Sequence, residues 1–178
     1  MSPTGGDVLL DRDGVIVRDR PGYIRRPDQL ELLPGAAEAI QRLRRDGRRV
    51  MVLTNQSVVG RGLVSRALLD DIHARLREMV RGADGGIDEF FVCPHHPDHG
   101  CGCRKPRPGL FFAARDSAGV DLGSAVMVGD SASDIAAAHS AGCSAIRVDP
   151  GGESAADTVV VPDLGAAVDV LLGSRVAC

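Results

Sequence analysis

Carboxylates and a hydroxyl follow three short apolar runs in this sequence of 178 residues. The runs end in Asp11-Arg12-Asp13-Gly14, in Thr54-Asn55-Gln56-Ser57 and in Gly129-Asp130-Ser131-Ala132-Ser133-Asp134. Short apolar runs rich in β-branched residues are typical of strands buried on both faces of a sheet. In a sheet of parallel strands the carboxyl ends meet at one edge, where ligands bind. We therefore expect these polar groups to surround one crevice.

The acidic residues of that crevice indicate a divalent cation. Clustered carboxylates repel one another unless a cation lies among them. A set of oxygen ligands suits Mg²⁺, which keeps several waters and binds substrate phosphate. With Thr54 and Lys105 holding the other oxygens of a phosphoryl group, one oxygen of Asp11 stays free to attack phosphorus. This chemistry produces an aspartyl phosphate.

Arginine supplies nearly all of the positive charge, and Lys105 is the exception. The chain has 21 basic residues, of which 20 are arginine, and 24 acidic ones. A lone lysine suggests a task that needs a compact, mobile ammonium rather than a planar guanidinium. The net charge of −3 and the aromatic content of 3% argue against a nucleic-acid-binding module.

The elements that must position these residues alternate between strand and helix. Apolar runs predict strands at 7–10, 48–53, 87–92 and 124–128, with weaker candidates at 145–148 and 158–161. Apolar stripes and capping residues predict helices that begin near Pro34, Ser65, Pro108, Ser131 and Asp163. The alternation favours the α/β class, with a doubly wound parallel sheet and helices on both faces. Because the irregular stretches 18–33 and 93–108 lie between core elements, residues 1–178 are expected to form one domain.

A cluster of cysteine and histidine residues lies in the second irregular stretch. Cys93, His95, Cys101 and Cys103 offer three sulfurs and one imidazole, a tetrahedral Zn²⁺ set. Since protein fills all four positions, the ion is expected to be structural and to order the loop 93–103 ahead of Lys105. His96 and His99 are alternative imidazole ligands. In a reducing compartment such a cluster favours a metal over disulfides.

Together these motifs resemble those of the haloacid-dehalogenase superfamily phosphatases. Asp11-x-Asp13 is similar to the first motif of that superfamily, Thr54 to the second, Lys105 to the third and Gly129-Asp130-x-x-x-Asp134 to the fourth. The resemblance implies that Asp11 is the nucleophile. It implies that Asp13 is the general acid toward the leaving group and then the base that activates water. It also implies that Asp130 binds Mg²⁺ with Asp11 and the Asp13 carbonyl, and that Ser131 and Asp134 support the fourth motif.

The zinc loop followed by Cys-Arg-Lys-Pro resembles members of the superfamily that lack a large cap domain. Two such groups act on a heptose 1,7-bisphosphate or on histidinol phosphate, and the Pro108-Gly109 pair favours the first group, which removes the 7-phosphate. Without a cap, loops must select the substrate, and Arg104 is placed to hold a second phosphate. The candidate substrate-binding residues are Asp19, Gly22, Tyr23, Asn55, Gln56, Ser57, Arg61 and Arg104.

Two positions depart from the pattern of that superfamily. Val58 stands where glycine is common, and a β-branched residue adopts positive φ with difficulty, so the loop is expected to sit differently. Ser131 stands where some members have lysine, which leaves Lys105 as the only lysine for the phosphoryl group.

A receiver-like phosphoacceptor is the alternative function, because it also combines acids, a hydroxyl and a lysine on a parallel sheet. The phosphatase hypothesis implies a small phosphorylated sugar as substrate and no nucleic-acid or membrane partner. It also implies that the protein is a monomer. No apolar run approaches the roughly 18 residues of a membrane span, so a cytoplasmic location is expected.

Overall fold

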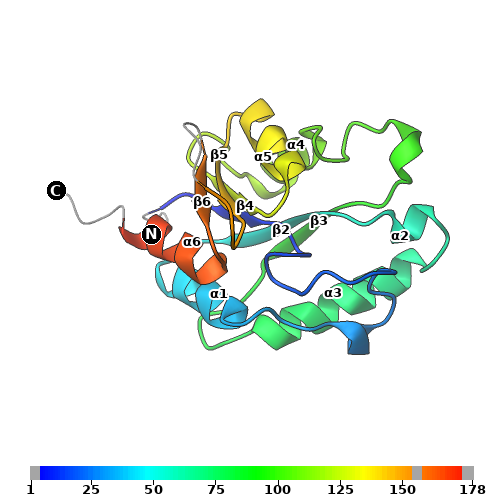
Figure 1. The fold of residues 1–178 in the computed structure, drawn as a ribbon, viewed down its shortest axis with the longest axis horizontal. Coiled ribbons are helices and arrows are strands. Elements are labelled where there is room, and N and C mark those ends of the chain that lie inside the picture. The colour runs from blue at the N-terminus through cyan, green and yellow to red at the C-terminus, as the bar shows by residue number, and fades with distance from the viewer. Residues whose placement is uncertain (1–4, 154–157, 174–178) are drawn as a thin grey trace.

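Six strands form one parallel sheet at the centre of the molecule (Figure 1). The structure is a computed structural model, and it describes residues 5–153 and 158–173. The strand order is β3-β2-β1-β4-β5-β6, and every pairing is parallel. The strands are β1 (Val8–Leu10), β2 (Val50–Asn55), β3 (Glu89–Cys93), β4 (Val126–Gly129), β5 (Ser144–Val148) and β6 (Val159–Val161). The predicted doubly wound α/β sheet is thus confirmed, and its order reverses between β1 and β4.

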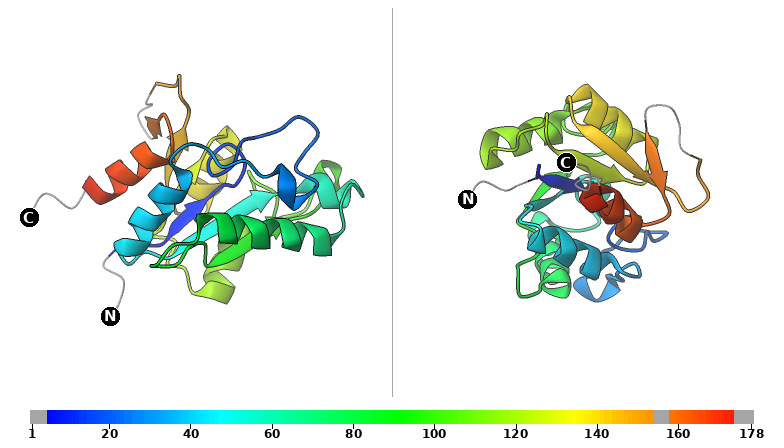
Figure 2. Two further views of the ribbon diagram at one scale, coloured as in Figure 1. Left: turned by 90° about the horizontal axis from the view of Figure 1, so that it is seen from below. Right: turned by 90° about the vertical axis from the view of Figure 1, so that its left-hand side faces the viewer.

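Helices cover both faces of this sheet (Figures 1 and 2). One face carries α1 (Ala36–Arg45), α3 (Arg66–Val80) and α6 (Leu164–Gly173), and the other carries α4 (Gly109–Ala118) and α5 (Ala132–Ser140). In β1, Val8 and Leu10 pack on the first face and Leu9 on the second. Because both faces are covered, the central strands consist almost entirely of apolar residues and show no polar alternation.

Capping side chains fix the starts of three helices where the sequence predicts them. Ser65 accepts a hydrogen bond from the Leu68 amide (3.1 Å), and Asp163 accepts one from the Ala166 amide (2.8 Å). Ser131 and Asp134 form a reciprocal capping box at the start of α5. The four-residue helix α2 (Ser57–Gly60) was not predicted, since so short an element has no periodicity.

Two irregular segments rise above the carboxyl edge of the sheet. The first is closed at its base, because Val17 bridges to Leu32 and the Arg18 amide donates to the Glu31 carbonyl (2.8 Å). The second joins β3 to α4 through a short 3-10 turn, Pro97–His99. Both segments therefore border the place where the strand-end residues converge. Within the described ranges, no helix has the length and apolar character that crossing a bilayer requires.

Candidate active site

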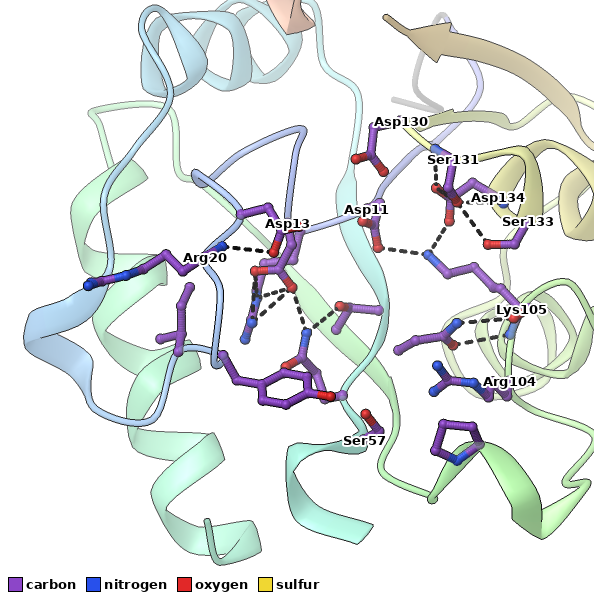
Figure 3. Close-up of a pocket in the computed structure, with 18 of the residues that line it drawn as sticks. Asp11, Asp13, Arg20, Ser57, Arg104, Lys105, Asp130, Ser131, Ser133 and Asp134 are labelled. Atoms are coloured by element: carbon purple, nitrogen blue, oxygen red, sulfur yellow. Dashed lines mark hydrogen bonds and ion pairs between the residues drawn. The ribbon is translucent and has the colours of Figure 1, made fainter. Parts of the chain in front are cut away.

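A cavity of about 300 Å³ opens at the carboxyl edge of β1, β2 and β4 (Figure 3). Nearly every predicted active-site residue lines it: Asp11, Asp13, Asp19, Tyr23, Thr54, Asn55, Gln56, Ser57, Arg61, Arg104, Lys105, Asp130, Ser131 and Asp134. Gly22 does not line it. The cavity also includes five residues that sequence reasoning missed, namely Arg12, Arg20, Ile24, Pro97 and Ser133.

Lys105 is the buried cation of this cavity, with 3% of its surface exposed. Its Nζ lies 2.7 Å from Asp11 Oδ1, 2.6 Å from Asp134 Oδ1 and 2.6 Å from the Leu53 carbonyl oxygen. An ammonium has three N–H donors, so these three acceptors satisfy it fully. A phosphoryl oxygen can bind this nitrogen only by sharing or replacing one of them.

The backbone of Lys105 is attached to the end of β2. Its amide donates to Asn55 Oδ1, and Asn55 Nδ2 donates to its carbonyl oxygen, each over 3.1 Å. The Asn55 side chain therefore pairs with the Lys105 backbone as a neighbouring strand would. It fixes the loop that places the Lys105 ammonium beside Asp11.

Asp11, Asp130 and Asp134 bring carboxylate oxygens within 4.8 Å of one another. Both oxygens of Asp134 are occupied, because Oδ1 faces Lys105 and Oδ2 accepts from the amide (3.0 Å) and hydroxyl (2.7 Å) of Ser131. Asp130 has no ion-pair partner within the described ranges. Asp11 and Asp130 are therefore the carboxylates best placed to bind a cation. Gly14, at φ +81°, leaves the space that Asp130 occupies, since a Cβ there would overlap its Oδ2.

Burial and charge shift the titration of this cluster. Burial, opposed by Lys105 and reinforced by Asp134, raises the pKa of Asp11 from 3.8 to about 7. Burial and the charge of Asp134 raise the pKa of Asp130 to about 6. Burial lowers the pKa of Lys105, but Asp11 and Asp134 outweigh it and the net shift is upward. The ammonium is thus charged at pH 7, while a full set of ionised carboxylates calls for a further cation.

Asp13 lies on the opposite side of Asp11 from Lys105 (Figure 3). Its carboxylate accepts from Nε and Nη2 of Arg12 over 2.9–3.2 Å, and from Gln56 Nε2 over 2.8 Å. Gln56 Nε2 also donates to Thr54 Oγ1 (2.9 Å). Arg12, Asp13, Gln56 and Thr54 therefore form one connected network along the cavity wall.

Arginines dominate the outer rim of the cavity. Arg20, Arg61 and Arg104 line it, and the Arg61 guanidinium lies 6.0 Å from the centre of the Tyr23 ring. Arg104 Nη1 is buried without a hydrogen-bond partner. A buried N–H without a partner is costly, which makes this nitrogen a ready donor to a ligand.

The cysteine cluster comes together as the spacing predicts. Sulfur and imidazole atoms of Cys93, His95, Cys101 and Cys103 lie within 4.8 Å of one another, and His95 Nδ1 is 3.2 Å from Cys103 Sγ. The cluster contains His95 rather than His96, whose Nδ1 accepts from the Asp98 amide (3.3 Å). These four side chains are compatible with a bound metal ion.

Close packing joins the cysteine loop to its neighbours. Gly60 at the end of α2 donates to the Pro94 carbonyl (2.8 Å), and a Cβ at Gly60 would overlap the His96 backbone. Val58 is fully buried with helical geometry in α2, so this position needs no positive φ. The chain enters a helical turn at Ser57, and this turn accommodates the β-branched Val58 without positive φ.

The site and fold agree with the comparisons to known proteins. Residues 5–142 match the model of the haloacid dehalogenase-like hydrolase family. The chain is 41% identical over 172 residues to D-glycero-beta-D-manno-heptose-1,7-bisphosphate 7-phosphatase of Pseudomonas aeruginosa, covering 93% of this chain and 97% of that one. It is 46% identical over 142 residues to D-glycero-alpha-D-manno-heptose-1,7-bisphosphate 7-phosphatase of Mycobacterium tuberculosis, covering 78% and 74%.

A solved structure of similar fold is D,D-heptose 1,7-bisphosphate phosphatase from Bordetella bronchiseptica, complexed with magnesium and phosphate. Its TM-score is 0.88 at 37% identity, over 96% of this chain and 99% of that one. The chain therefore belongs to the haloacid dehalogenase-like hydrolase family. Within that family it is a phosphatase, as its relatives at these identities are.

Proposed function

We propose that the protein removes the 7-phosphate of D-glycero-D-manno-heptose 1,7-bisphosphate through an aspartyl phosphate on Asp11. The observation that carries this proposal is the contact of Asp11 with Lys105 in a cavity that also holds Arg104 with its unpartnered nitrogen. One group attacks phosphorus beside a cation, and the other offers a donor to a second anion. The names of relatives that cover most of the chain support the same substrate.

We assign the roles from the resemblance to the family, and the positions of the side chains support them. Asp11 attacks phosphorus, and Thr54 and Lys105 bind the non-bridging oxygens of the phosphoryl group as its charge redistributes. Asp13 donates a proton to the leaving sugar alkoxide and later accepts one from the attacking water. Ser131 and Asp134 fix the start of α5 and the position of Lys105. The wall that faces the sugar consists of the other predicted substrate-binding residues that line the cavity: Asp19, Tyr23, Asn55, Gln56, Ser57 and Arg61. Gly22 precedes Tyr23 in the chain and lies outside this wall.

Mg²⁺ fits the acidic cluster, because Asp11 and Asp130 offer carboxylate oxygens on the side that Lys105 does not occupy. These two residues, with the Asp13 carbonyl, would hold the ion. A bound Mg²⁺ supplies positive charge that lets the nucleophile and the phosphate approach each other.

The raised pKa values predict how pH and Mg²⁺ affect stability. The pKa values of Asp11 and Asp130 are raised above their unfolded value of 3.8, so each carboxyl contributes its full stability to the fold below pH 3.8. This contribution is lost as the pH rises through about 6 for Asp130 and about 7 for Asp11. We expect the metal-free protein to melt at lower temperature at about pH 8 than at about pH 5, and Mg²⁺ to raise the melting temperature more at the higher pH. Equal Mg²⁺ shifts at both pH values, measured by calorimetry, would contradict this assignment.

Zn²⁺ is the ion that we propose for Cys93, His95, Cys101 and Cys103. Removing it with a chelator and restoring Mg²⁺ in excess should lower the melting temperature by roughly 5–10 °C, because a structural ion stabilises the loop. Activity should fall as well, since this loop leads into Lys105. Cys103→Ser should reproduce both effects. Cys143→Ser, in the core and outside the loop, is the control for activity. Unchanged melting and activity after chelation would rule out a structural ion.

Arg104 is proposed to bind the phosphate that is not cleaved. Arg104→Ala should raise KM for the bisphosphate roughly 10- to 100-fold, because a charge-assisted contact is worth about 1.5–3 kcal/mol. A heptose 7-phosphate, which lacks the second phosphate, should show little change between the two proteins. An equal loss on both substrates would place Arg104 in the chemical step instead.

Parallel steady-state kinetics test the substrate assignment. The substrates are both anomers of heptose 1,7-bisphosphate, since relatives of this chain carry the name of either anomer, and histidinol phosphate, the alternative substrate. A higher kcat/KM on histidinol phosphate would overturn the heptose proposal. A phosphoenzyme that persists for many minutes would favour the phosphoacceptor switch, whereas a lifetime of seconds or less supports hydrolysis. The monomeric state, the extent of the domain over residues 1–178 and the cytoplasmic location stay predictions.

A further inference from the structure

Arg12 lines the cavity, yet it is buried, with 1% of its surface exposed. Nε and Nη2 face the Asp13 carboxylate over 2.9–3.2 Å. The third nitrogen, Nη1, lies 3.2 Å from Nε2 of His73. The cation is thus held between the carboxylate that it contacts and an imidazole 61 residues further along the chain.

His73 lies in α3 and is itself buried, with 4% of its surface exposed. Its ring stacks on the Phe90 ring of β3, with centroids 4.3 Å apart and an angle of 5° between the planes. Because every nitrogen of arginine can only donate, His73 Nε2 must accept and the ring proton must sit on Nδ1. Burial, followed by the charges of Arg12, Arg66 and Arg77, lowers the pKa of His73 to about 3, so the imidazole is neutral at pH 7.

We propose that His73 is a positioning residue for proton transfer by Asp13, acting through Arg12. This inference rests on the proposed function, which gives Asp13 the proton that the leaving alkoxide requires. Without the acceptor on His73, Arg12 Nη1 would be a buried donor with no partner, which is costly. The guanidinium would rotate until Nη1 reached another acceptor, and the Asp13 carboxylate, which is hydrogen-bonded to Nε and Nη2, would be displaced with it. Displacements of about 1 Å at a reacting group can lower rates by as much as about 10²-fold.

Two substitutions separate the acceptor from the packing. His73→Phe keeps an aromatic ring that can stack on Phe90 and removes the acceptor, whereas His73→Gln keeps an acceptor near the position of Nε2. His73→Leu is a second variant without an acceptor, for use if His73→Phe folds poorly. Melting temperature and Zn²⁺ content are measured for each variant.

The readout is kcat/KM on two substrates that differ in their need for a proton. The leaving group of a sugar phosphate is an alkoxide, which needs a proton from a general acid. The leaving group of p-nitrophenyl phosphate is a stable phenolate, which does not. We expect His73→Phe to lower kcat/KM on heptose 1,7-bisphosphate about tenfold more than on p-nitrophenyl phosphate, within the range of about 10²–10⁴-fold that general acids contribute. His73→Gln should restore most of the lost selectivity.

Asp13→Asn, assayed in the same way, distinguishes failure of this inference from failure of the proposed function. If Asp13→Asn loses activity equally on both substrates, the acid role of Asp13 is wrong and the inference falls with it. If Asp13→Asn is selective but His73→Phe and His73→Leu lower both substrates equally, His73 is merely structural. Adding His73→Phe to Asp13→Asn should cause no further loss of selectivity, because the two residues act in one pathway.

Discussion

Asp11→Asn should lower phosphatase turnover by about 10⁴-fold or more, because an amide cannot replace the carboxylate that attacks phosphorus. The fold should survive the change. The raised pKa of Asp11, about 7, shows that burial makes its ionised form costly, and a neutral amide of the same shape avoids that cost. Phosphate release with saturating Mg²⁺ and melting temperature are the two measurements.

A matched control is Asp116→Asn. Asp116 is exposed near the end of α4 and pairs with Arg115 over 2.7 Å, away from the cavity. This variant should keep full activity. Near-normal turnover by purified Asp11→Asn that melts like the wild type would show that the reaction does not pass through an aspartyl phosphate on this residue.

Lys105→Met is expected to have the second-largest effect, a loss of about 10³-fold in kcat. It removes the cation that faces Asp11 and Asp134 and the donor proposed to bind the phosphoryl oxygens. The two carboxylates are then buried together without their ammonium. Removing one partner of a buried ion pair lowers the free energy of unfolding by several kcal/mol. The loss of stability should therefore be larger at about pH 8 than at about pH 5, where protonation of Asp11 relieves the repulsion between the two carboxylates.

Lys105→Arg provides the comparison for this prediction. The three acceptors around Nζ lie at 2.6–2.7 Å and surround a compact ammonium, and a planar guanidinium does not match that arrangement. We expect Lys105→Arg to keep more stability than Lys105→Met and to recover little activity. If Lys105→Arg recovered wild-type kcat, positive charge alone would suffice and the geometry of the ammonium would not matter.

The central sheet and much of the cavity follow from local sequence patterns. Asp11 and Asp130 directly follow the apolar strands β1 and β4, and Thr54 lies near the carboxyl end of β2. Parallel pairing brings these strand ends to one edge. Lys105 was predicted as well, because a single lysine in an arginine-rich chain stood just before a predicted helix. Predictions of this kind work where a side chain is fixed by the end of a regular element.

Residues whose role depends on a distant partner could not be predicted in this way. In the sequence, nothing distinguishes Arg12 from any residue between two aspartates. Its contact with His73 exists only because the fold brings α3 close to Arg12 Nη1. A histidine on the buried side of an apolar helix was the available signal, but the sequence does not say what it faces. Arg20 lines the cavity without having been predicted, and Gly22 does not line it. Irregular loops have no periodicity that would indicate which of their residues face a cavity.

The pairing of Asn55 with the backbone of Lys105 fixes the ammonium at the end of β2, whatever the segment before it contains. Segment 94–104 leaves the sheet at Cys93 and returns at Lys105, and each end is tied to a strand. Its length and composition can therefore change while the ammonium keeps its place beside Asp11, provided that Cys93, His95, Cys101 and Cys103, the side chains proposed to bind Zn²⁺, remain. An engineer who wants a phosphatase for another ester can graft a new segment here, and divergence within such a scaffold can proceed along the same path.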